Sequence, residues 1–328
     1  SFGRTRPDGR NVTLEDLLPF EGIIPLGKLQ DILIYNKNKP KKYNTTFPGY
    51  KDNMINVHLV SHSHDDIGWK KTVTQYYKGS NNTITGGGTS AGAGVEYILD
   101  SVILNLPKDK NRKFIYVEIG FFSRWYDEQD DSIKKIVKEL VNNKQLEFVN
   151  GGWCMSDEAA PYYIDMIDQQ TLGHLWLLRE FGVNAIPETG WQIDPFGHSN
   201  FMAQAYALMG MSSWFFGRID YQNRRQREST QTIEVVQRPS NSLLSSDVDI
   251  FTSIMRHYMP PKDFHFEYAA PDTPFQDDPT LEDYNVLDKI NNFVSLMYNQ
   301  YQITNGHHIM VPMGGDFNYC AAAVWFKQ

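Results

Sequence analysis

Short apolar runs alternate with amphipathic stretches from Asn56 to the end of the chain, and this alternation predicts its architecture. Repeated strand–helix units are typical of an α/β domain built around a parallel sheet. Most of the runs are continuously apolar, as expected for strands covered on both faces. The predicted strands are 56–60, 113–117, 146–149, 189–193, 213–216, 249–254 and 308–313. Seven such strands favour a seven-stranded (β/α) barrel-like domain or an open doubly wound sheet, and both bind ligands at the carboxyl ends of their strands.

Helical spacing of apolar residues predicts four helices between these strands. The first runs from Val95 to Leu106 and stops before Pro107, and the second covers residues 133–141 with Ser132 as its cap. A third covers residues 162–181, and a fourth begins near Asn200. These helices supply the connections that parallel strands require.

Polar stretches divide the chain further. Residues 1–55 mix Pro, Lys, Asn and Gly with brief apolar clusters, which predicts an extended N-terminal segment without catalytic residues. The Gly- and Asn-rich stretch 79–94 predicts a flexible loop, and the charged stretch 222–247 predicts a long surface insertion. Residues 56–328 are therefore the domain in which we expect the functional site.

Composition and charge exclude several classes of function. Hydrophobic residues make up 41% of the 328 residues and charged residues 21%, as in an ordinary globular protein. The formal net charge of -8 argues against nucleic acid as a partner, because binding to a phosphate backbone requires a basic surface. No apolar run reaches the roughly 18 residues of a membrane-spanning helix, so no membrane span is predicted.

Cysteines and glycosylation motifs bear on the compartment. Cys154 and Cys320 are too few for a disulfide framework or a Cys-rich metal site, and a bridge between them or to another chain stays open. N-x-[ST] motifs at Asn11, Asn44 and Asn81 fit a glycoprotein of the secretory pathway.

The strand predicted at 56–60 runs directly into the sequence HSHDDIGW at 62–69. In extended backbone, residues two apart point to the same side, so His62 with His64, or His64 with Asp66, can present two ligands to one ion. Imidazole nitrogen together with carboxylate oxygen suits zinc. The alternative is that these side chains only form hydrogen bonds in a buried turn.

Two further predicted strands also end in carboxylates. Asp194 follows the strand at 189–193, and Pro195 stops that strand because it has no N–H to donate. Asp316 follows the strand at 308–313 after two glycines, which allow unusual backbone angles or close approach of a ligand. Each motif alone is also compatible with a simple turn. Together they indicate three strand ends with carboxylates, the first of them with metal-type ligands, and two carboxylates on a sugar-binding rim are what glycoside hydrolysis requires.

These motifs resemble the glycoside hydrolase family 38 α-mannosidases from about Asn56 onward. The stretches that carry the resemblance are HSHDDIGW at 62–69, EFVNGGWCMSDE at 147–158, IDMIDQ at 164–169, GWQIDPFGHS at 190–199 and FFGRIDYQ at 215–222. The resemblance implies a retaining exo-α-mannosidase that removes terminal α-linked mannose from N-glycan oligosaccharides through a covalent glycosyl-enzyme.

The resemblance also implies roles for individual residues. It favours His64 over His62 and implies that His64, Asp66 and Asp194 bind zinc. Asp194 doubles as the nucleophile, and Asp316 matches the acid/base. The implied sugar contacts are Trp69, Arg218 and Tyr258.

The family pattern has a fourth zinc ligand, a histidine, downstream of where this chain stops. The resemblance therefore implies that a C-terminal chain of the same processed precursor completes the site, and a homo-oligomer is also compatible with the sequence. The Asp65–Asp66 pair resembles the lysosomal or vacuolar branch, so we expect a protein of the lysosome or vacuole, or a secreted one.

Two other classes of function use the same residue types. A zinc-dependent deacetylase or phosphoesterase has His and Asp ligands at strand ends, but its nucleophile is a metal-bound water rather than Asp194. A non-catalytic glycan-binding fragment would hold a sugar on aromatic side chains near the metal without cleaving it.

Overall fold

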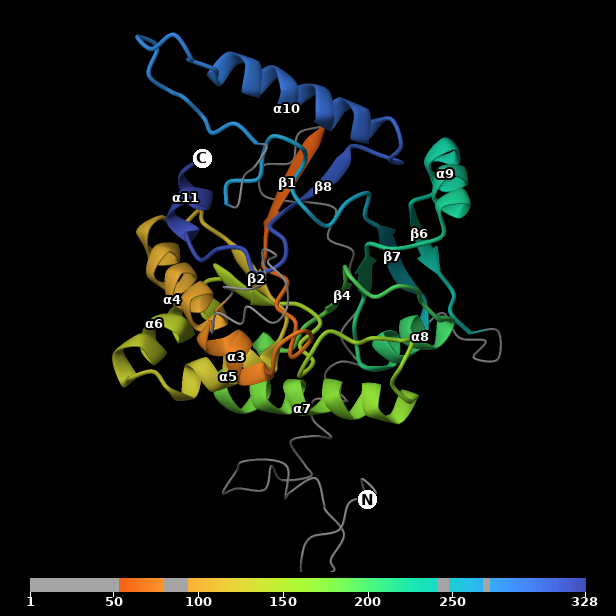
Figure 1. The fold of residues 1–328 in the computed structure, drawn as a ribbon. Coiled ribbons are helices and arrows are strands. Elements are labelled where there is room, and N and C mark those ends of the chain that lie inside the picture. Colours follow the sequence, from red (N-terminus) through yellow and green to blue (C-terminus); the bar gives the residue numbers. More distant parts are fainter. Residues whose placement is uncertain (1–52, 80–93, 241–247, 268–271) are drawn as a thin grey trace, which may run out of the picture. The chain divides into compact units, whose positions relative to one another are not determined.

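The computed structural model describes residues 53–79, 94–240, 248–267 and 272–328. Within these ranges the chain forms an α/β domain in which helices and strands alternate (Figure 1). The strands are β1 Asn56–Ser61, β2 Phe114–Tyr116, β3 Leu146–Phe148, β4 Thr189–Gln192, β5 Ser213–Phe216, β6 Glu234–Gln237, β7 Ile250–Ile254 and β8 His308–Met313. All seven predicted strands are therefore confirmed, and β6 is an addition.

The described strands pair in three small sheets. β1 pairs with β8, and β2 with β3, both in parallel. The third sheet has the order β4-β5-β7-β6, in which only β6 runs antiparallel. Between the first two sheets a single bridge joins His62 to Ile115, and the Asn150 N–H donates to the Thr189 carbonyl (2.7 Å) beyond the end of β3. The predicted parallel α/β class is confirmed, whereas one continuous seven-stranded ladder is not seen, because strands of three to six residues leave only single contacts between neighbouring sheets.

The helices agree with the four predicted and add several more. They are α3 Val73–Lys78, α4 Val95–Asn105, α5 Ile119–Asp127, α6 Asp131–Asn142, α7 Tyr163–Phe181, α8 Asn200–Leu208, α9 Tyr221–Thr230, α10 Val286–Tyr301 and α11 Ala322–Lys327, with short 3-10 turns at Leu106–Lys108 and Val183–Ala185. Ser132 does not cap α6. Asp130 does, because its carboxylate accepts from the backbone N–H groups of Ser132 and Ile133.

The stretch predicted as a surface insertion at 222–247 does lie at the surface in its described part, but it contains the helix α9 and the edge strand β6 rather than a loop. Helix α9 buries no residue, so it has no apolar stripe for periodicity to detect. The predicted segment 1–55, apart from residues 53–55, and the predicted loop 79–94, apart from its two end residues, lie outside the described residues. Asn11, Asn44 and Asn81 also lie outside them.

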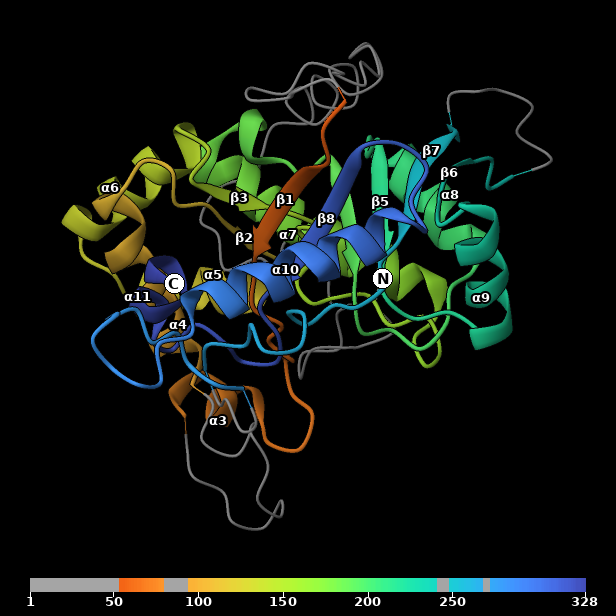
Figure 2. The same ribbon diagram turned by 90° about the horizontal axis from the view of Figure 1, so that it is seen from above.

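Apolar side chains cover both faces of β5, as its continuous run predicted, whereas Val57 and Leu59 leave one face of β1 exposed. On β5, Trp214 and Phe216 pack outward into a cluster with α8, whereas Phe215 packs inward against Trp191 and Ile193. The outward cluster lies between the strands and the surrounding helices, which flank them in both views (Figures 1 and 2). The inward cluster lies directly beneath the strand ends that carry the polar motifs.

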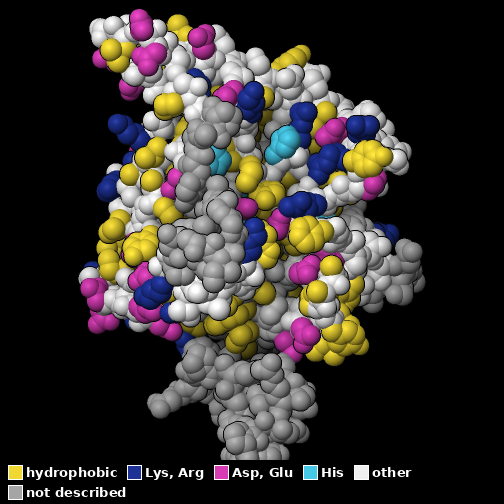
Figure 3. All heavy atoms as spheres, in the orientation of Figure 1, with side chains coloured by type: hydrophobic (Ala, Val, Ile, Leu, Met, Phe, Trp, Pro, Cys, Tyr) yellow, Lys and Arg dark blue, Asp and Glu magenta, His cyan; other side chains and the backbone are white. Residues whose placement is uncertain are grey.

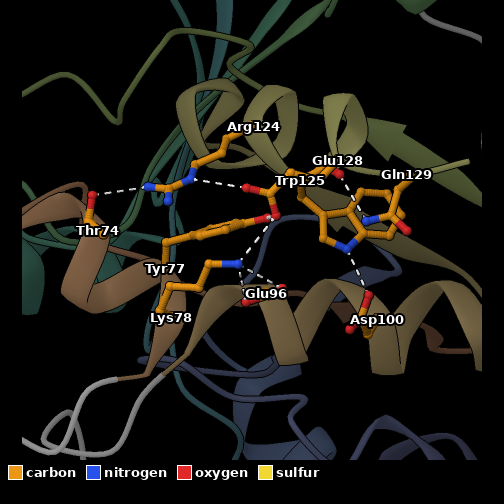
Figure 4. Close-up of polar contacts among 9 residues, drawn as sticks. All are labelled: Thr74, Tyr77, Lys78, Glu96, Asp100, Arg124, Trp125, Glu128 and Gln129. Carbon is orange, nitrogen blue, oxygen red and sulfur yellow. Dashed lines mark hydrogen bonds and ion pairs between the residues drawn. The ribbon is translucent and has the colours of Figure 1, made fainter.

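A polar network ties α3, α4 and α5 together beside the segment that follows the HSHDDIGW motif (Figure 4). Glu128 accepts from the Tyr77 hydroxyl (2.7 Å) and pairs with Lys78 (3.4 Å). Arg124 stacks over the Tyr77 ring at 4.1 Å and donates to Thr74 (3.1 Å). Since α3 follows Trp69 closely in the chain, this network fixes the far end of the segment that carries Trp69.

The surface carries charges of both signs. Basic and acidic side chains both lie on the face seen in Figure 3. No helix in the described ranges is long and apolar enough to cross a membrane. Cys154 and Cys320 form no disulfide with each other, which was one of the pairings that the sequence left open.

Candidate active site

Residues from the ends of β1 and β4 form a cluster of three metal-type ligands. The Nε2 atom of His64 lies 3.3 Å from Asp66 Oδ1 and 3.7 Å from Asp194 Oδ2. One ligand atom from each side chain lies within 4.8 Å of the others. His64 is buried, while the two carboxylates are about one quarter exposed. The structure thus brings together the three residues that the family resemblance implies as zinc ligands.

Backbone contacts place Asp316 beside this cluster. The His64 N–H donates to the Gly315 carbonyl (3.0 Å), and the Phe317 N–H donates to the His64 carbonyl (2.9 Å), so His64 and Asp316 lie side by side. Gly314 allows this approach, because a Cβ atom there would lie 1.7 Å from the carbonyl oxygen of His62. The glycines before Asp316 therefore serve close packing of two strand ends.

The structure separates His62 from His64, which the i,i+2 pattern left equivalent. His62 is fully buried, and its Nε2–H donates to the backbone carbonyl of Tyr258 (3.0 Å). Burial lowers the pKa of His62 to about 3, so this imidazole is neutral. His62 holds the segment that carries Tyr258, and His64 alone faces the carboxylates.

Asp194 lies between two positively charged partners. Its Oδ2 faces His64, and its Oδ1 accepts from Arg218 Nη2 at 2.5 Å. His64 and then Arg218 lower the pKa of Asp194 to about 2, against the opposing effect of partial burial. Gly217 brings Arg218 this close, because the backbone there packs directly on the Ile193 carbonyl. Asp194 is therefore ionised, as a nucleophile or a metal ligand must be.

Asp316 has the opposite electrostatic character. Burial raises its pKa, and the Asp66 and Asp194 carboxylates add to this effect. The Tyr258 hydroxyl donates to Asp316 Oδ1 (3.2 Å) and opposes it in part, as does His64. A carboxyl group with a raised pKa beside an ionised one is the arrangement in which the first can donate a proton.

The donor set fits a zinc ion. Two ligand atoms bound to tetrahedral zinc at 2.0–2.1 Å are about 3.3–3.4 Å apart, and the distance from His64 Nε2 to Asp66 Oδ1 is 3.3 Å. Imidazole nitrogen and carboxylate oxygen are both zinc ligand types, and three protein ligands leave a position for another ligand or a substrate oxygen. Without a metal, burial lowers the pKa of His64, but Asp194 and Asp66 outweigh it and raise that pKa well above its ordinary value. A proton then takes the place of the ion between these carboxylates.

Two buried carboxyl groups lie near the ligands. Asp65 accepts from the hydroxyls of Ser63 (2.7 Å) and Tyr116 (2.9 Å), and burial raises its pKa to about 6. Burial also raises the pKa of Glu118 well above its ordinary value, and Glu118 in turn raises the pKa of His64. Burial thus favours the neutral form of both carboxyl groups, whereas the lowered pKa of Asp194 favours its ionised form.

Of the three predicted sugar contacts, two lie at the carboxylates and one does not. Arg218 and Tyr258 lie against the two carboxylates as described. Trp69 is 61% exposed, and its ring contacts the Lys70 ammonium group at 4.2 Å, so its role as a sugar contact remains a prediction. Sequence reasoning missed Phe196, whose ring lies 5.1 Å from the Arg218 guanidinium and is 74% exposed. An exposed aromatic side chain two residues after Asp194 was the signal that pointed to it.

Comparison with known proteins identifies the family. Residues 54–328 match the N-terminal domain of the glycosyl hydrolases family 38. An α-mannosidase of Arabidopsis thaliana is 53% identical over 88% of this chain and 27% of its own length. The α-mannosidase of Canavalia ensiformis is 49% identical over 88% of the chain, and human lysosomal α-mannosidase is 43% identical over 86%, each over 28% of its own length. The chain thus spans little more than a quarter of these curated relatives.

A solved structure supports the fold independently. The crystal structure of an α-mannosidase from Enterococcus faecalis V583 superposes with a TM-score of 0.56, over 80% of this chain and 25% of that one, at 17% identity. At this identity the likeness concerns the fold alone. Because the family match covers most of the chain and includes every strand end described above, the chain belongs to glycoside hydrolase family 38, whose N-terminal domain it carries.

Proposed function

We propose that the protein is a retaining exo-α-mannosidase that uses zinc and removes terminal α-linked mannose from N-glycan oligosaccharides. The observation that carries this proposal is the contrast between two neighbouring carboxyl groups. Asp194 has its pKa lowered to about 2 within the His64–Asp66–Asp194 cluster, whereas burial raises the pKa of Asp316 beside it. A retaining glycosidase requires this pair, one ionised nucleophile and one proton donor.

In the first step, an Asp194 oxygen attacks the anomeric carbon while Asp316 gives its proton to the glycosidic oxygen, whose bond to that carbon breaks. In the second step, Asp316 takes a proton from water, the water oxygen bonds to the anomeric carbon, and Asp194 leaves as a carboxylate. Arg218 favours this departure because its charge stabilises the Asp194 carboxylate. Tyr258 orients Asp316 through its hydroxyl.

His64, Asp66 and Asp194 are the residues that hold the metal in this proposal. A zinc ion bound there would act as a Lewis acid that binds sugar hydroxyls and favours distortion of the mannose ring toward the oxocarbenium-like transition state. A histidine from outside this chain is the fourth ligand. The length of the curated relatives, whose matched part is 27–28% of their total, is consistent with a longer precursor that contributes this ligand.

The remaining proposals extend from the family. Residues 56–328 form a barrel-like catalytic domain, a proposal supported by the His62–Ile115 bridge and the Asn150–Thr189 hydrogen bond between the small sheets. The protein acts in the lysosome or vacuole, as the human relative is named a lysosomal enzyme. Trp69 packs against the mannose ring together with Phe196.

A mechanism-based probe tests the proposal. A fluorinated mannosyl fluoride, which slows the second step, is incubated with the protein expressed from its complete gene, and the labelled peptide is mapped by mass spectrometry. The expected label lies on Asp194 and is absent from an Asp194→Asn variant. Turnover without any trapped ester would instead support a metal-bound water as nucleophile, as in a zinc-dependent deacetylase or phosphoesterase. Binding without turnover would support a non-catalytic glycan-binding protein.

A further inference from the structure

The turn that carries Asp194 is held by one buried carboxylate, that of Glu158. Its Oε1 accepts from Gln192 Nε2 (3.1 Å) and His198 Nδ1 (2.9 Å). Its Oε2 accepts from the Ser199 backbone N–H (2.7 Å). The Glu158 side chain is 5% exposed and that of His198 is 8% exposed. Three donors thus converge on one carboxylate that is almost entirely removed from solvent.

These three donors bracket Asp194 in the sequence. Gln192 is the last residue of β4, two positions before Asp194, whereas His198 and Ser199 follow it and lead into α8. The Ser199 side chain makes no capping hydrogen bond, so the Glu158 carboxylate supplies the negative charge that the start of α8 favours. Glu158 therefore joins the strand before the turn to the helix after it.

The turn needs contacts from outside it. Pro195 fixes its own φ angle but has no N–H to donate, and Phe196 is 74% exposed. The Glu158 loop is anchored in turn, because Gln192 Nε2 also donates to the Ser156 carbonyl (2.9 Å). The geometry of Asp194 consequently depends on a residue that contacts neither Asp194 nor any ligand of the proposed metal.

We propose that Glu158 is a positioning residue, whose carboxylate holds the Asp194 turn in the geometry that nucleophilic attack and metal binding require. This inference rests on the proposed function of Asp194. An ionised carboxylate is an acceptor at both oxygens, and hydrogen bonds to it are stronger than those between neutral groups. Three such bonds hold the turn in one arrangement.

Glu158→Gln tests the role with almost no change in size. The amide has one acceptor oxygen, and its NH2 group must face either Ser199 or the pair of Gln192 and His198, all of which are donors. At least one of the three contacts becomes repulsive. We expect kcat to fall by about 10- to 100-fold and the affinity of the apoprotein for zinc to weaken by a similar factor. KM should change by less than about threefold, because Glu158 touches no substrate.

Gln145→Glu is the matched control. Gln145 is buried, and its Nε2 donates to the carbonyls of Leu106 (2.9 Å), Asp109 (2.9 Å) and Arg112 (3.2 Å). It directly precedes β3, at the opposite strand ends from Asp194. The control makes the reverse exchange of amide for carboxylate at a buried position, where Gln145 Oε1 also accepts from Asn143 Nδ2 (3.0 Å). We expect it to lower thermal stability without changing kcat per folded molecule or zinc affinity.

The experiment uses the protein expressed from its complete gene. Turnover of 4-nitrophenyl α-mannoside is normalised to folded protein, and zinc affinity is measured on the apoprotein by competition with a chelating indicator. Unchanged kcat and zinc affinity in Glu158→Gln would overturn the proposal, as would an equal loss in Gln145→Glu. If Glu158→Gln does not fold, the test uses Glu158→Asp, which keeps both acceptor oxygens on a shorter side chain. A loss of kcat and of zinc affinity in this variant supports the positioning role. Wild-type values of both overturn it.

An Asp194→Asn variant separates this inference from the proposed function. If Asp194→Asn keeps wild-type turnover, Asp194 is not the nucleophile, and the positioning role falls with it. If Asp194→Asn is inactive while Glu158→Gln behaves as wild type, the proposed function stands and only the role of Glu158 is overturned.

Discussion

Gly217→Ala is the substitution for which the structure gives the clearest expected cost. A Cβ atom at this position would lie 2.4 Å from the carbonyl oxygen of Ile193, whereas ordinary carbon–oxygen contacts are about 3.3–3.6 Å. The backbones must therefore separate by about 1 Å. This separation would weaken the hydrogen bond that the Gly217 N–H donates to the Gln192 carbonyl at 3.2 Å. The methyl group forces apart the two strand ends that carry Asp194 and Arg218.

Two costs follow from this separation. Overpacking of a close backbone contact destabilises a protein by about 1–3 kcal/mol. The displacement also moves Arg218 away from Asp194, and a misplacement of about 1 Å at a catalytic group costs on the order of 100-fold in rate, or about 2.7 kcal/mol. We expect kcat/KM on 4-nitrophenyl α-mannoside to fall by about that factor, together with a lower melting temperature.

Gly197→Ala is the control for this prediction. Gly197 lies only three residues after Asp194, yet a Cβ atom there would meet no atom within 4 Å. We therefore expect almost unchanged kcat/KM and melting temperature. Both variants are assayed as the protein from its complete gene, with rates normalised to folded protein. If Gly197→Ala were the more damaging of the two, or if Gly217→Ala kept wild-type kcat/KM, the packing argument would be refuted.

Three further outcomes follow from the site. Asp316→Asn should lower turnover by about 10²- to 10⁴-fold on substrates with poor leaving groups and by much less on 2,4-dinitrophenyl α-mannoside. Steady-state rates on the two kinds of substrate test this difference. Tyr258→Phe removes a hydrogen bond that stabilises ionised Asp316, so the pKa of Asp316 rises and the alkaline limb of kcat/KM moves to higher pH; a shift to lower pH would contradict this. Zinc affinity of the apoprotein should weaken as pH falls, because the metal must displace a proton from His64. Asp194 and Asp66 outweigh burial and raise the pKa of that imidazole. Zinc titrations that give the same affinity at pH 5 and pH 7 would exclude His64 as a ligand.

The sequence pattern was sufficient to find seven of the strands because each is a short, mainly apolar run between polar segments. The same reasoning failed for α9, which has no buried residue, and for β6, which is only partly buried and lies at a sheet edge. Helix propensity alone does not distinguish an exposed helix from a polar insertion, because the stability of such a helix comes from contacts at its ends. One such contact is Arg224, which donates to the Met255 carbonyl (2.9 Å).

The candidate site was predictable as a set of strand ends but not as a geometry. An i,i+2 pattern puts His62 and His64 on one side only while the backbone stays extended. β1 ends at Ser61, and beyond it His62 enters the core under Tyr258 whereas His64 pairs with the segment of Asp316. Which histidine faces the carboxylates depends on that point of termination, which local sequence does not encode.

The roles of the two carboxyl groups follow from how the fold distributes charge around them. Both groups are near His64, and that proximity lowers the pKa of each. They differ because Arg218 donates to Asp194 directly, whereas Asp316 is more buried and faces the negative charge of Asp66 and Asp194. A cation held by His64, Asp66 and Asp194 would take two of these carboxylates as ligands, so it would stabilise ionised Asp194 more than Asp316. Metal binding therefore strengthens a difference that the protein already establishes, and exchanging the roles of nucleophile and acid would require moving both Arg218 and the ligand set.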